Sequence, residues 1–168
     1  VLGPRIERWA LAVVTGAEAE YVSEGIGSGF LIERGAALTF KHELARQIVL
    51  EATAPTQRCA LHRLSLLALR AHATTRDDLT RLAHHAEGSG EAEWILHYAL
   101  AAARQAADAR THRAAARLFE LALSCAAGLG AAERAQLWLD YSVECDVTSR
   151  RPDAMKALDE ARRLFLEA

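Results

Sequence analysis

The segment Phe40-Lys41-His42-Glu43-Leu44-Ala45-Arg46 follows two short β-prone runs and opens a stretch with helical periodicity. The β-prone runs are residues 30–32 and 38–40, and a polar, glycine-containing segment, residues 33–36, separates them. This pattern predicts a β-hairpin whose loop is longer than two residues. The apolar residues that follow recur at helical spacing and stop before Pro55, so we expect a helix that ends there.

Helices are also predicted on both sides of this region. Upstream, Gly3-Pro4 is a helix-start signal, and a second helix is expected over residues 17–26 with Tyr21 directed inward. Downstream, a helix that begins at Pro55 has an apolar face that we expect to be buried, composed of Leu61, Leu64, Leu67, Ala68 and Ala71. Helix, helix, hairpin, helix is the order of a winged helix that lacks its first helix, and we assign residues 1–74 to this domain.

Residues 75–168 contain only helical patterns. A helix capped by Asp77-Asp78 is expected to reach Ala86, where Gly88-Ser89-Gly90 interrupts it. Longer helices are predicted over residues 91–108, 111–127, 131–147 and 151–167.

These helices repeat at an interval of 39 residues, since Ala115, Phe119 and Ala122 recur as Ala154, Leu158 and Ala161. The pattern resembles tetratricopeptide repeats, in which small residues let two antiparallel helices approach each other and a large residue fills the gap. The unit is longer than the consensus of about 34 residues, and Ser142 stands where glycine is typical. We therefore expect a mainly α fold, in which a partial winged-helix domain with a small β-hairpin precedes an α-helical, tetratricopeptide-like hairpin array over residues 75–168.

Composition and charge argue against several classes of function. Three widely spaced cysteines do not form a disulfide framework or a zinc site, and they favour a reducing cytoplasm. The formal net charge of −2 gives no electrostatic reason to expect nucleic acid, and the second predicted helix carries Glu18, Glu20 and Glu24 without a basic residue. No apolar run approaches the roughly 18 to 20 residues that a membrane span needs. We expect no direct contact with nucleic acid or with a membrane.

The segment 40–46 resembles the Phe-x-His-Glu-Leu-x-Arg signature in the winged-helix segment of STAND-type signalling ATPases, including the large LuxR-family transcriptional regulators. Residues 82–88 also resemble a segment at the junction between winged helix and repeats in these regulators. The resemblance implies a fragment of a cytoplasmic bacterial signal-transduction ATPase, with the ATPase core before Val1 and a DNA-binding helix-turn-helix after Ala168. ATP and ADP would be cofactors of the parent protein. The fragment itself has no phosphate-binding GxxxxGK[ST] loop, so we expect no cofactor and no enzymatic activity in it.

His42 is the first candidate binding residue. In the resembled family the histidine of this motif faces the β-phosphate of ADP, which the neighbouring ATPase domain holds. Unpaired N–H groups and the helix dipole favour an anion at such a helix start. The alternative is that His42 only begins the helix and bonds to the hairpin. Glu43 and Arg46, one turn apart, are expected to pair with each other or with the hairpin.

A groove on the repeats is the second candidate. Trp94, Phe119, Trp138 and Phe165 are predicted to be core residues. Alternatively, Trp138 and Tyr141 line a concave groove of the kind that stacked helical hairpins expose, with Glu144 and Asp146 favouring basic or polar ligands. Two further expectations concern other side chains. Histidines 62, 84, 85 and 97 are expected to pack or cap rather than bind a metal, and Cys59 is expected in the core.

The resemblance also implies partners. These are the ATPase domain of the same chain and a protein or small-molecule effector on the repeats, with an ATP-bound state that forms homo-oligomers. Two alternatives share the same residues: the corresponding region of a cyclase- or kinase-linked ATPase, and a helical-repeat adaptor without an ATPase.

Overall fold

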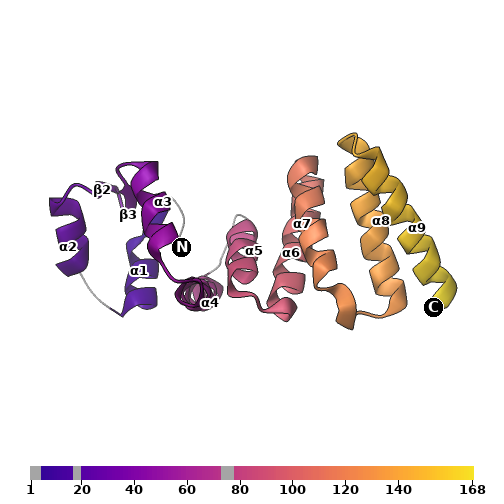
Figure 1. Ribbon diagram of the computed structural model, residues 1–168, viewed down its shortest axis with the longest axis horizontal. Helices are drawn as coiled ribbons and strands as arrows, with labels where there is room; N and C mark the ends of the chain where they lie inside the picture. The colour runs from indigo at the N-terminus through magenta and orange to yellow at the C-terminus, as the bar shows by residue number, and fades with distance from the viewer. Residues whose placement is uncertain (1–4, 17–19, 73–77) are drawn as a thin grey trace. The chain divides into compact units, whose positions relative to one another are not determined.

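The computed structural model describes residues 5–16, 20–72 and 78–168. The chain divides into two compact units, Val1–Thr74 and Thr75–Ala168, which we call unit 1 and unit 2 and describe separately. Helices dominate both units, and unit 1 also contains a small antiparallel sheet (Figure 1). The predicted mainly α fold with a β-hairpin is confirmed.

Unit 1 combines a three-stranded sheet with four helices in its described residues. The elements are β1 (Arg5–Glu7), α1 (Arg8–Thr15), α2 (Glu20–Gly27), β2 (Leu31–Arg34), β3 (Ala37–Phe40), α3 (Glu43–Ala52) and α4 (Pro55–His72). The strand order is β1-β3-β2, and both pairings are antiparallel. From β1 to β3, the order of elements is strand, helix, helix, strand, strand.

The first strand was not predicted from the sequence. Residues 5–7 pair with β3 instead of continuing the helix that Gly3-Pro4 was expected to begin, so the described helix starts only at Arg8. Ile6 lies opposite Leu38 in the register, and both side chains are buried. Pairing with β3 satisfies the backbone hydrogen-bonding groups of this segment and buries Ile6. This gain outweighs the local helical preference, because only a few residues define the helical periodicity here.

The hairpin is tighter than predicted. Arg34 pairs with Ala37, which leaves only Gly35 and Ala36 in the loop, so the expectation of a longer loop was wrong. Gly35 has φ of 62°. A positive φ at the first central residue is what the two-residue hairpin turns require, and glycine adopts it without a steric cost. Strands β2 and β3 can therefore extend into the polar segment 33–36 that was predicted to be the loop.

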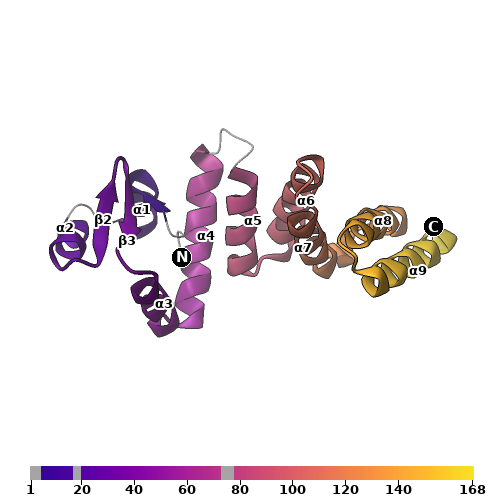
Figure 2. The same ribbon diagram turned by 90° about the horizontal axis from the view of Figure 1, so that it is seen from above.

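The core of unit 1 lies where α1 and α4 pack together (Figure 2). The buried face of α4 consists of Ser65, Leu66, Ala68 and Leu69. This corrects the predicted face, because Leu64 and Leu67 are nearly half exposed. Burial of Ser65 is tolerated since its hydroxyl donates to the Leu61 carbonyl at 2.7 Å. Tyr21 on α2 is also exposed rather than directed inward.

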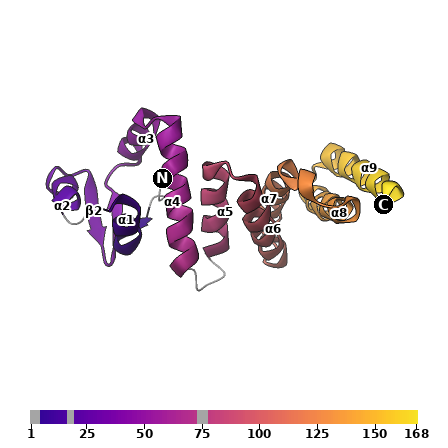
Figure 3. The same ribbon diagram turned by 90° about the horizontal axis from the view of Figure 1, so that it is seen from below.

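Unit 2 is a row of helices in which each packs against its neighbours in sequence (Figure 3). They are α5 (Asp78–Ser89), α6 (Ala92–Asp108), α7 (His112–Ser124), a short 3-10 turn (Ala126–Gly128), α8 (Ala131–Val147) and α9 (Arg151–Glu167). Three predicted ranges agree to within one residue. Helix α5 continues through Gly88 and ends at Ser89, and Gly90 follows it with φ of 73°. Among the described residues, no helix is both long and apolar enough to span a membrane.

The 39-residue repeat is visible in the backbone. Helices α6 and α8 begin at Ala92 and Ala131 and end at Asp108 and Val147, so both ends are 39 residues apart. The connections repeat as well. Arg110 and Ser149 both adopt positive φ, at 56° and 63°. Each is followed by a residue whose N–H donates to a carbonyl five residues back, at 2.9 Å from Thr111 and 2.8 Å from Arg150. This is the C-terminal helix cap known as the Schellman motif.

Alanine fills the interior of the two hairpins, α6–α7 and α8–α9. The fully or almost fully buried alanines are Ala99, Ala102, Ala103, Ala115, Ala116, Ala122, Ala135, Ala157 and Ala161. Their small side chains allow the helix backbones to approach closely. Phe119 is buried as predicted, whereas Phe165 is about half exposed, so its assignment to the core was wrong.

Ser149 provides a test of the repeated cap. A residue with a Cβ pays about 1–2 kcal/mol in the left-handed region, most for β-branched side chains. Because Ser149 already pays this cost, we expect Ser149→Gly to raise the free energy of unfolding by up to about 1 kcal/mol. We expect Ser149→Val to lower it, because a β-branched side chain tolerates this region less well than serine. Urea denaturation followed by circular dichroism measures both. A glycine variant that is less stable than the valine variant would contradict the left-handed cap.

Candidate functional site

His42 stands at the start of α3 and is exposed. Its backbone is extended, with φ of −129° and ψ of 128°, as is usual for a residue that precedes a helix. The His42 carbonyl accepts a hydrogen bond from the N–H of Ala45 at 3.1 Å. On the sheet side, the N–H of Lys41 donates to the Phe30 carbonyl at 2.9 Å. The hairpin and the helix therefore hold the backbone of His42 from both sides, while its imidazole faces outward.

Glu43 and Arg46 pair with each other. The Arg46 Nε lies 2.9 Å from each carboxylate oxygen of Glu43. These hydrogen bonds lower the pKa of Glu43 and raise the pKa of Arg46. The pair spans the first turn of α3, so the Glu43 carboxylate next to His42 is paired with a guanidinium.

Helix α3 exposes an apolar face. Leu44, Ile48 and Val49 belong to the apolar residues that recur at helical spacing in this segment, and their side chains are 68, 57 and 49% exposed. Leu44 and Ile48 are one turn apart and so lie on the same side of the helix. Contiguous exposed apolar residues of this kind mark interaction surfaces in folded proteins.

The other candidates of unit 1 and the predicted histidine group do not assemble into a site. His85 is buried, whereas His84 and His97 are exposed. Within residues 5–16, 20–72 and 78–168, no three histidine, cysteine or acidic side chains are placed to hold a metal ion. Cys59 is exposed, so its assignment to the core was wrong. Glu24 is exposed on α2, and Glu18 lies outside the described residues.

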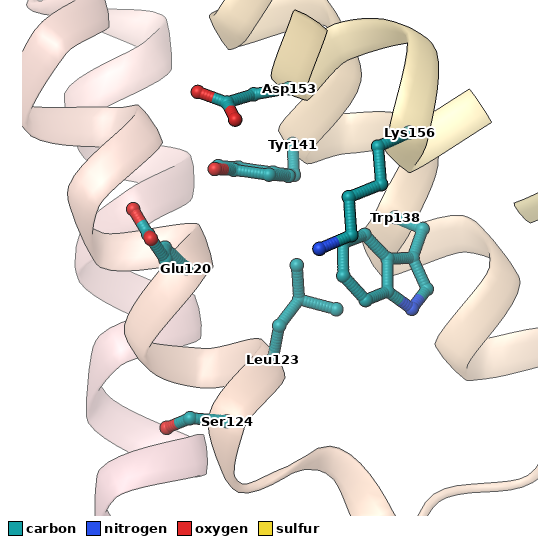
Figure 4. Close-up of a pocket in the computed structure, with 7 residues that line it drawn as sticks. All are labelled: Glu120, Leu123, Ser124, Trp138, Tyr141, Asp153 and Lys156. Carbon is teal, nitrogen blue, oxygen red and sulfur yellow. The ribbon is translucent and has the colours of Figure 1, made fainter. Parts of the chain in front are cut away.

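A groove in unit 2 contains both predicted groove residues, Trp138 and Tyr141. We call it the Trp138 groove; its volume is about 350 Å³. Three helices contribute its lining: Glu120, Leu123 and Ser124 from α7, Trp138 and Tyr141 from α8, and Asp153 and Lys156 from α9 (Figure 4). Figure 4 shows the carboxylates of Glu120 and Asp153 near the hydroxyl end of Tyr141, and the Lys156 amine near Trp138 and Leu123. The groove thus has an acidic end and an aromatic end.

Arg150 organises the acidic end. Its Nη2 donates to the Tyr141 hydroxyl at 3.1 Å, and its Nε donates to Asp153 Oδ2 at 2.8 Å. The same Nη2 lies 3.6 Å from Glu120 Oε2. The guanidinium carbon is 5.8 Å from the centre of the Tyr141 ring, within the range of a cation–π contact. One arginine therefore ties together side chains from α7, α8 and α9.

Tyr141 is the most strongly perturbed titratable group of this groove. Burial, together with a hydrogen bond to Cys145, raises the pKa of Tyr141 well above its ordinary value. Burial likewise raises the pKa of the Cys145 thiol. Both groups remain protonated at physiological pH, so the Tyr141 hydroxyl is a neutral hydrogen-bonding group at the side of the groove. Its ring meets Trp138 edge to face, with the ring centres 6.0 Å apart.

The acidic residues of the groove differ from the predicted ones. Glu144 is buried, and its carboxylate lies 2.9 Å from His112 Nδ1. Asp146 lines a separate groove. Glu120 and Asp153 take the expected acidic role instead. Only their positions on the flanking helices α7 and α9 bring them beside Trp138.

The Trp138 groove contains groups that can bind a ligand. Its aromatic end can stack against, or bury, an apolar group of a ligand. Its carboxylates accept hydrogen bonds from basic or N–H groups, and the ammonium of Lys156 donates to an anionic one. An amphipathic ligand with both kinds of group matches this arrangement.

Comparison of the chain with protein-family models, with curated proteins and with solved structures gave no match.

Tyr141 makes stability depend on alkaline pH. The unfolded chain releases the phenol proton near pH 10, whereas the folded chain releases it only at higher pH. The contribution of Tyr141 to stability is therefore complete below about pH 10 and declines as the pH rises toward the folded pKa. We expect the free energy of unfolding of the wild type to fall more steeply above about pH 10 than that of Tyr141→Phe, measured by urea denaturation. Equal slopes would contradict the raised pKa.

Proposed function

We propose that this chain is the coupling region of a cytoplasmic bacterial STAND-type signalling ATPase, a transcriptional regulator of the LuxR family. Unit 1 would contact the ATPase domain, and unit 2 would receive an effector or protein partner. The observation that carries the proposal is the exposed His42 at the start of α3, within the segment 40–46 that resembles the family signature. The strand and helix order of unit 1 supports it, because it agrees with a winged helix.

The position of His42 suits a contact with a diphosphate. An exposed imidazole N–H next to the first turn of a helix adds a donor to a region where the helix dipole already favours anions. The backbone of His42 is held between β3 and α3, so the ring is presented from a fixed point. In the proposed mechanism, this contact stabilises an ADP-bound closed state. Effector binding to unit 2 shifts the population toward an open, ATP-bound state that forms homo-oligomers.

The apolar face of α3 supports a protein contact at the same end of unit 1. Leu44 and Ile48 lie on the helix that His42 begins, and both are more than half exposed. A neighbouring ATPase domain that covers this face would bury apolar area and bring its nucleotide toward His42. The ion pair between Glu43 and Arg46 would lie beside that contact.

The Trp138 groove is the proposed effector site. Its aromatic and acidic ends are built by three helices, so a ligand that bridges them would change how α7, α8 and α9 pack together. A ligand that binds one arrangement of these helices more tightly than another would meet the physical requirement for an effector.

A helical-repeat adaptor without an ATPase is the second candidate function. Unit 2 favours it, because the row of hairpins and its groove need no nucleotide to form. The two functions differ in the flanking sequence of the gene. A GxxxxGK[ST] loop upstream supports the ATPase, and its absence from the complete reading frame supports the adaptor. A cyclase or kinase domain in that reading frame would identify the third alternative.

Substitution of His42 tests the nucleotide switch. In the complete protein, we expect His42→Ala to accelerate the release of ADP by about tenfold or more, because one hydrogen bond to a charged phosphate is lost. Stopped-flow fluorescence of a labelled ADP measures this rate. His97→Ala, an exposed histidine on α6, serves as the control and should leave the rate unchanged. Identical release rates for wild type and His42→Ala would reject the sensor role.

A further inference from the structure

The lining of the Trp138 groove includes three pairs of residues, one pair on each helix. The members of each pair are three residues apart in sequence: Glu120 and Leu123 on α7, Trp138 and Tyr141 on α8, and Asp153 and Lys156 on α9. Helix α8 runs opposite to α7 and α9 (Figure 1), so the order of its pair is reversed. Each helix therefore contributes one residue to the acidic end and one to the aromatic end (Figure 4). Because residues three apart on a helix lie about 5–6 Å apart at their Cβ atoms, the two ends are separated by about one helical turn.

The 39-residue repeat shows that this lining is specific to the second hairpin. The positions of Trp138, Tyr141, Arg150 and Asp153 correspond, in that order, to Ala99, Ala102, Thr111 and Ala114. Ala99 and Ala102 are buried, with 0 and 2% of their surface exposed. Packing of the repeat therefore requires neither the aromatic pair nor the cluster of Arg150 with its carboxylates.

Lys156 also differs from its counterpart in the first hairpin, Arg117. The Arg117 side chain extends to α5, where its Nη1 lies 3.4 Å from Glu87 Oε2. Within the described residues, the structure gives Lys156 no ion-pair partner, and Glu120 of α7 lies 3.6 Å from Arg150 Nη2 instead. The Lys156 ammonium, near Trp138 in Figure 4, can therefore bind an anionic group of a ligand without losing an ion pair within the protein.

The acidic end has the opposite imbalance of charge. Glu120 and Asp153 share the single guanidinium of Arg150, so this cluster carries one net negative charge. Their side chains are 60 and 45% exposed, which leaves carboxylate oxygens accessible to a ligand. Each carboxylate oxygen can accept more than one hydrogen bond. An ammonium group of a ligand can thus bind beside Arg150 and share these carboxylates with it.

The separation of the two ends selects among ligands that carry one cation and one anion. In a free amino acid, both charged groups are bonded to one carbon atom and lie about 2.5 Å apart. In an extended dipeptide they lie about 5–6 Å apart, because consecutive Cα atoms are about 3.8 Å apart. Only the second distance matches one helical turn. A side chain next to the carboxylate of such a ligand would meet Trp138 and Leu123, which lie near the Lys156 amine.

We propose that the Trp138 groove binds a small zwitterion with an apolar body, whose two charges are about one helical turn apart, such as a dipeptide. Its ammonium group lies against Glu120 and Asp153, its carboxylate pairs with Lys156, and its apolar side chain packs against Trp138. This inference rests on the proposed role of the groove as the effector site, and it specifies the chemical class of the effector.

Calorimetric titration of the full chain with the dipeptide alanyl-phenylalanine tests the proposal. We expect saturable binding with a Kd at or below about 1 mM. N-acetylation removes the cation of the ligand and C-terminal amidation removes its anion. Each modification should weaken the affinity by about tenfold or more, because a charge-assisted hydrogen bond is lost. Free phenylalanine should also bind more weakly, since its charges are too close together.

Two results of this titration would overturn the proposal. The first is the absence of saturable binding of alanyl-phenylalanine up to about 10 mM. The second is an equal affinity for the unmodified, the acetylated and the amidated dipeptide, which would mean that the groove does not recognise the two charges.

Substitutions identify the end of the groove at which each charge binds. Lys156→Met keeps the aliphatic chain, and it should weaken binding of the unmodified dipeptide by about tenfold while affecting the amidated one less. Glu120→Gln should weaken binding of the unmodified dipeptide and affect the acetylated one less. Arg117→Met makes the same change as Lys156→Met at the corresponding position of the first hairpin, and it should leave every affinity unchanged. Equal losses for the unmodified and the amidated dipeptide in Lys156→Met would contradict the proposed carboxylate contact.

The outcome is distinguishable from that of the nucleotide switch. Calorimetry on this chain needs no ATPase domain, so failure to bind the dipeptide would overturn this inference and leave the test of His42 intact. Dipeptide binding together with unchanged ADP release in His42→Ala would reject the nucleotide switch only. Circular dichroism controls for folding, since Glu120, Arg117 and Lys156 are exposed and their variants should melt like the wild type.

Discussion

The close packing of helices through alanine side chains is the constraint on which unit 2 depends. Ala99, Ala103, Ala115 and Ala122 are fully buried between α6 and its neighbours, so no larger side chain separates the backbones there. Large side chains such as Phe119, Leu137 and Leu164 are buried alongside these alanines. Other large side chains of α8 and α9 lie at the surface, where they line two grooves, one of which is the Trp138 groove.

Unit 2 holds its polar groups in two different ways. The pair of His112 and the buried Glu144 joins α7 to α8, so it has a structural role. Arg150 instead lies at the edge of the Trp138 groove and connects Glu120, Tyr141 and Asp153. A ligand that competes for Glu120 or Asp153 would disturb the contacts of Arg150 to three helices. Ligand binding in the groove could in this way change how α7, α8 and α9 pack together.

In unit 1, the pairing of the strands positions the candidate residue His42. The short strand β1 completes a three-stranded sheet, and β3 at its centre leads through Lys41 directly into His42 and α3. Because β3 is paired on both sides, the start of α3 has a fixed position relative to the sheet. The exposed His42 is followed in the same helix by the exposed apolar residues Leu44, Ile48 and Val49.

The sequence by itself determined the helical class, most helix boundaries and the 39-residue repeat, because these depend on local periodicity and on Gly and Pro signals. It also singled out His42, Trp138 and Tyr141. Which face of each helix is buried was decided only by tertiary packing: Leu64, Leu67, Cys59 and the stripe of α3 look like core in sequence but face outward. Neither strand β1 nor the acidic lining of the Trp138 groove could be predicted from the sequence. Both depend on partners far away in sequence, Leu38 for Ile6 and α7 and α9 for Trp138, and no local pattern records such long-range pairing.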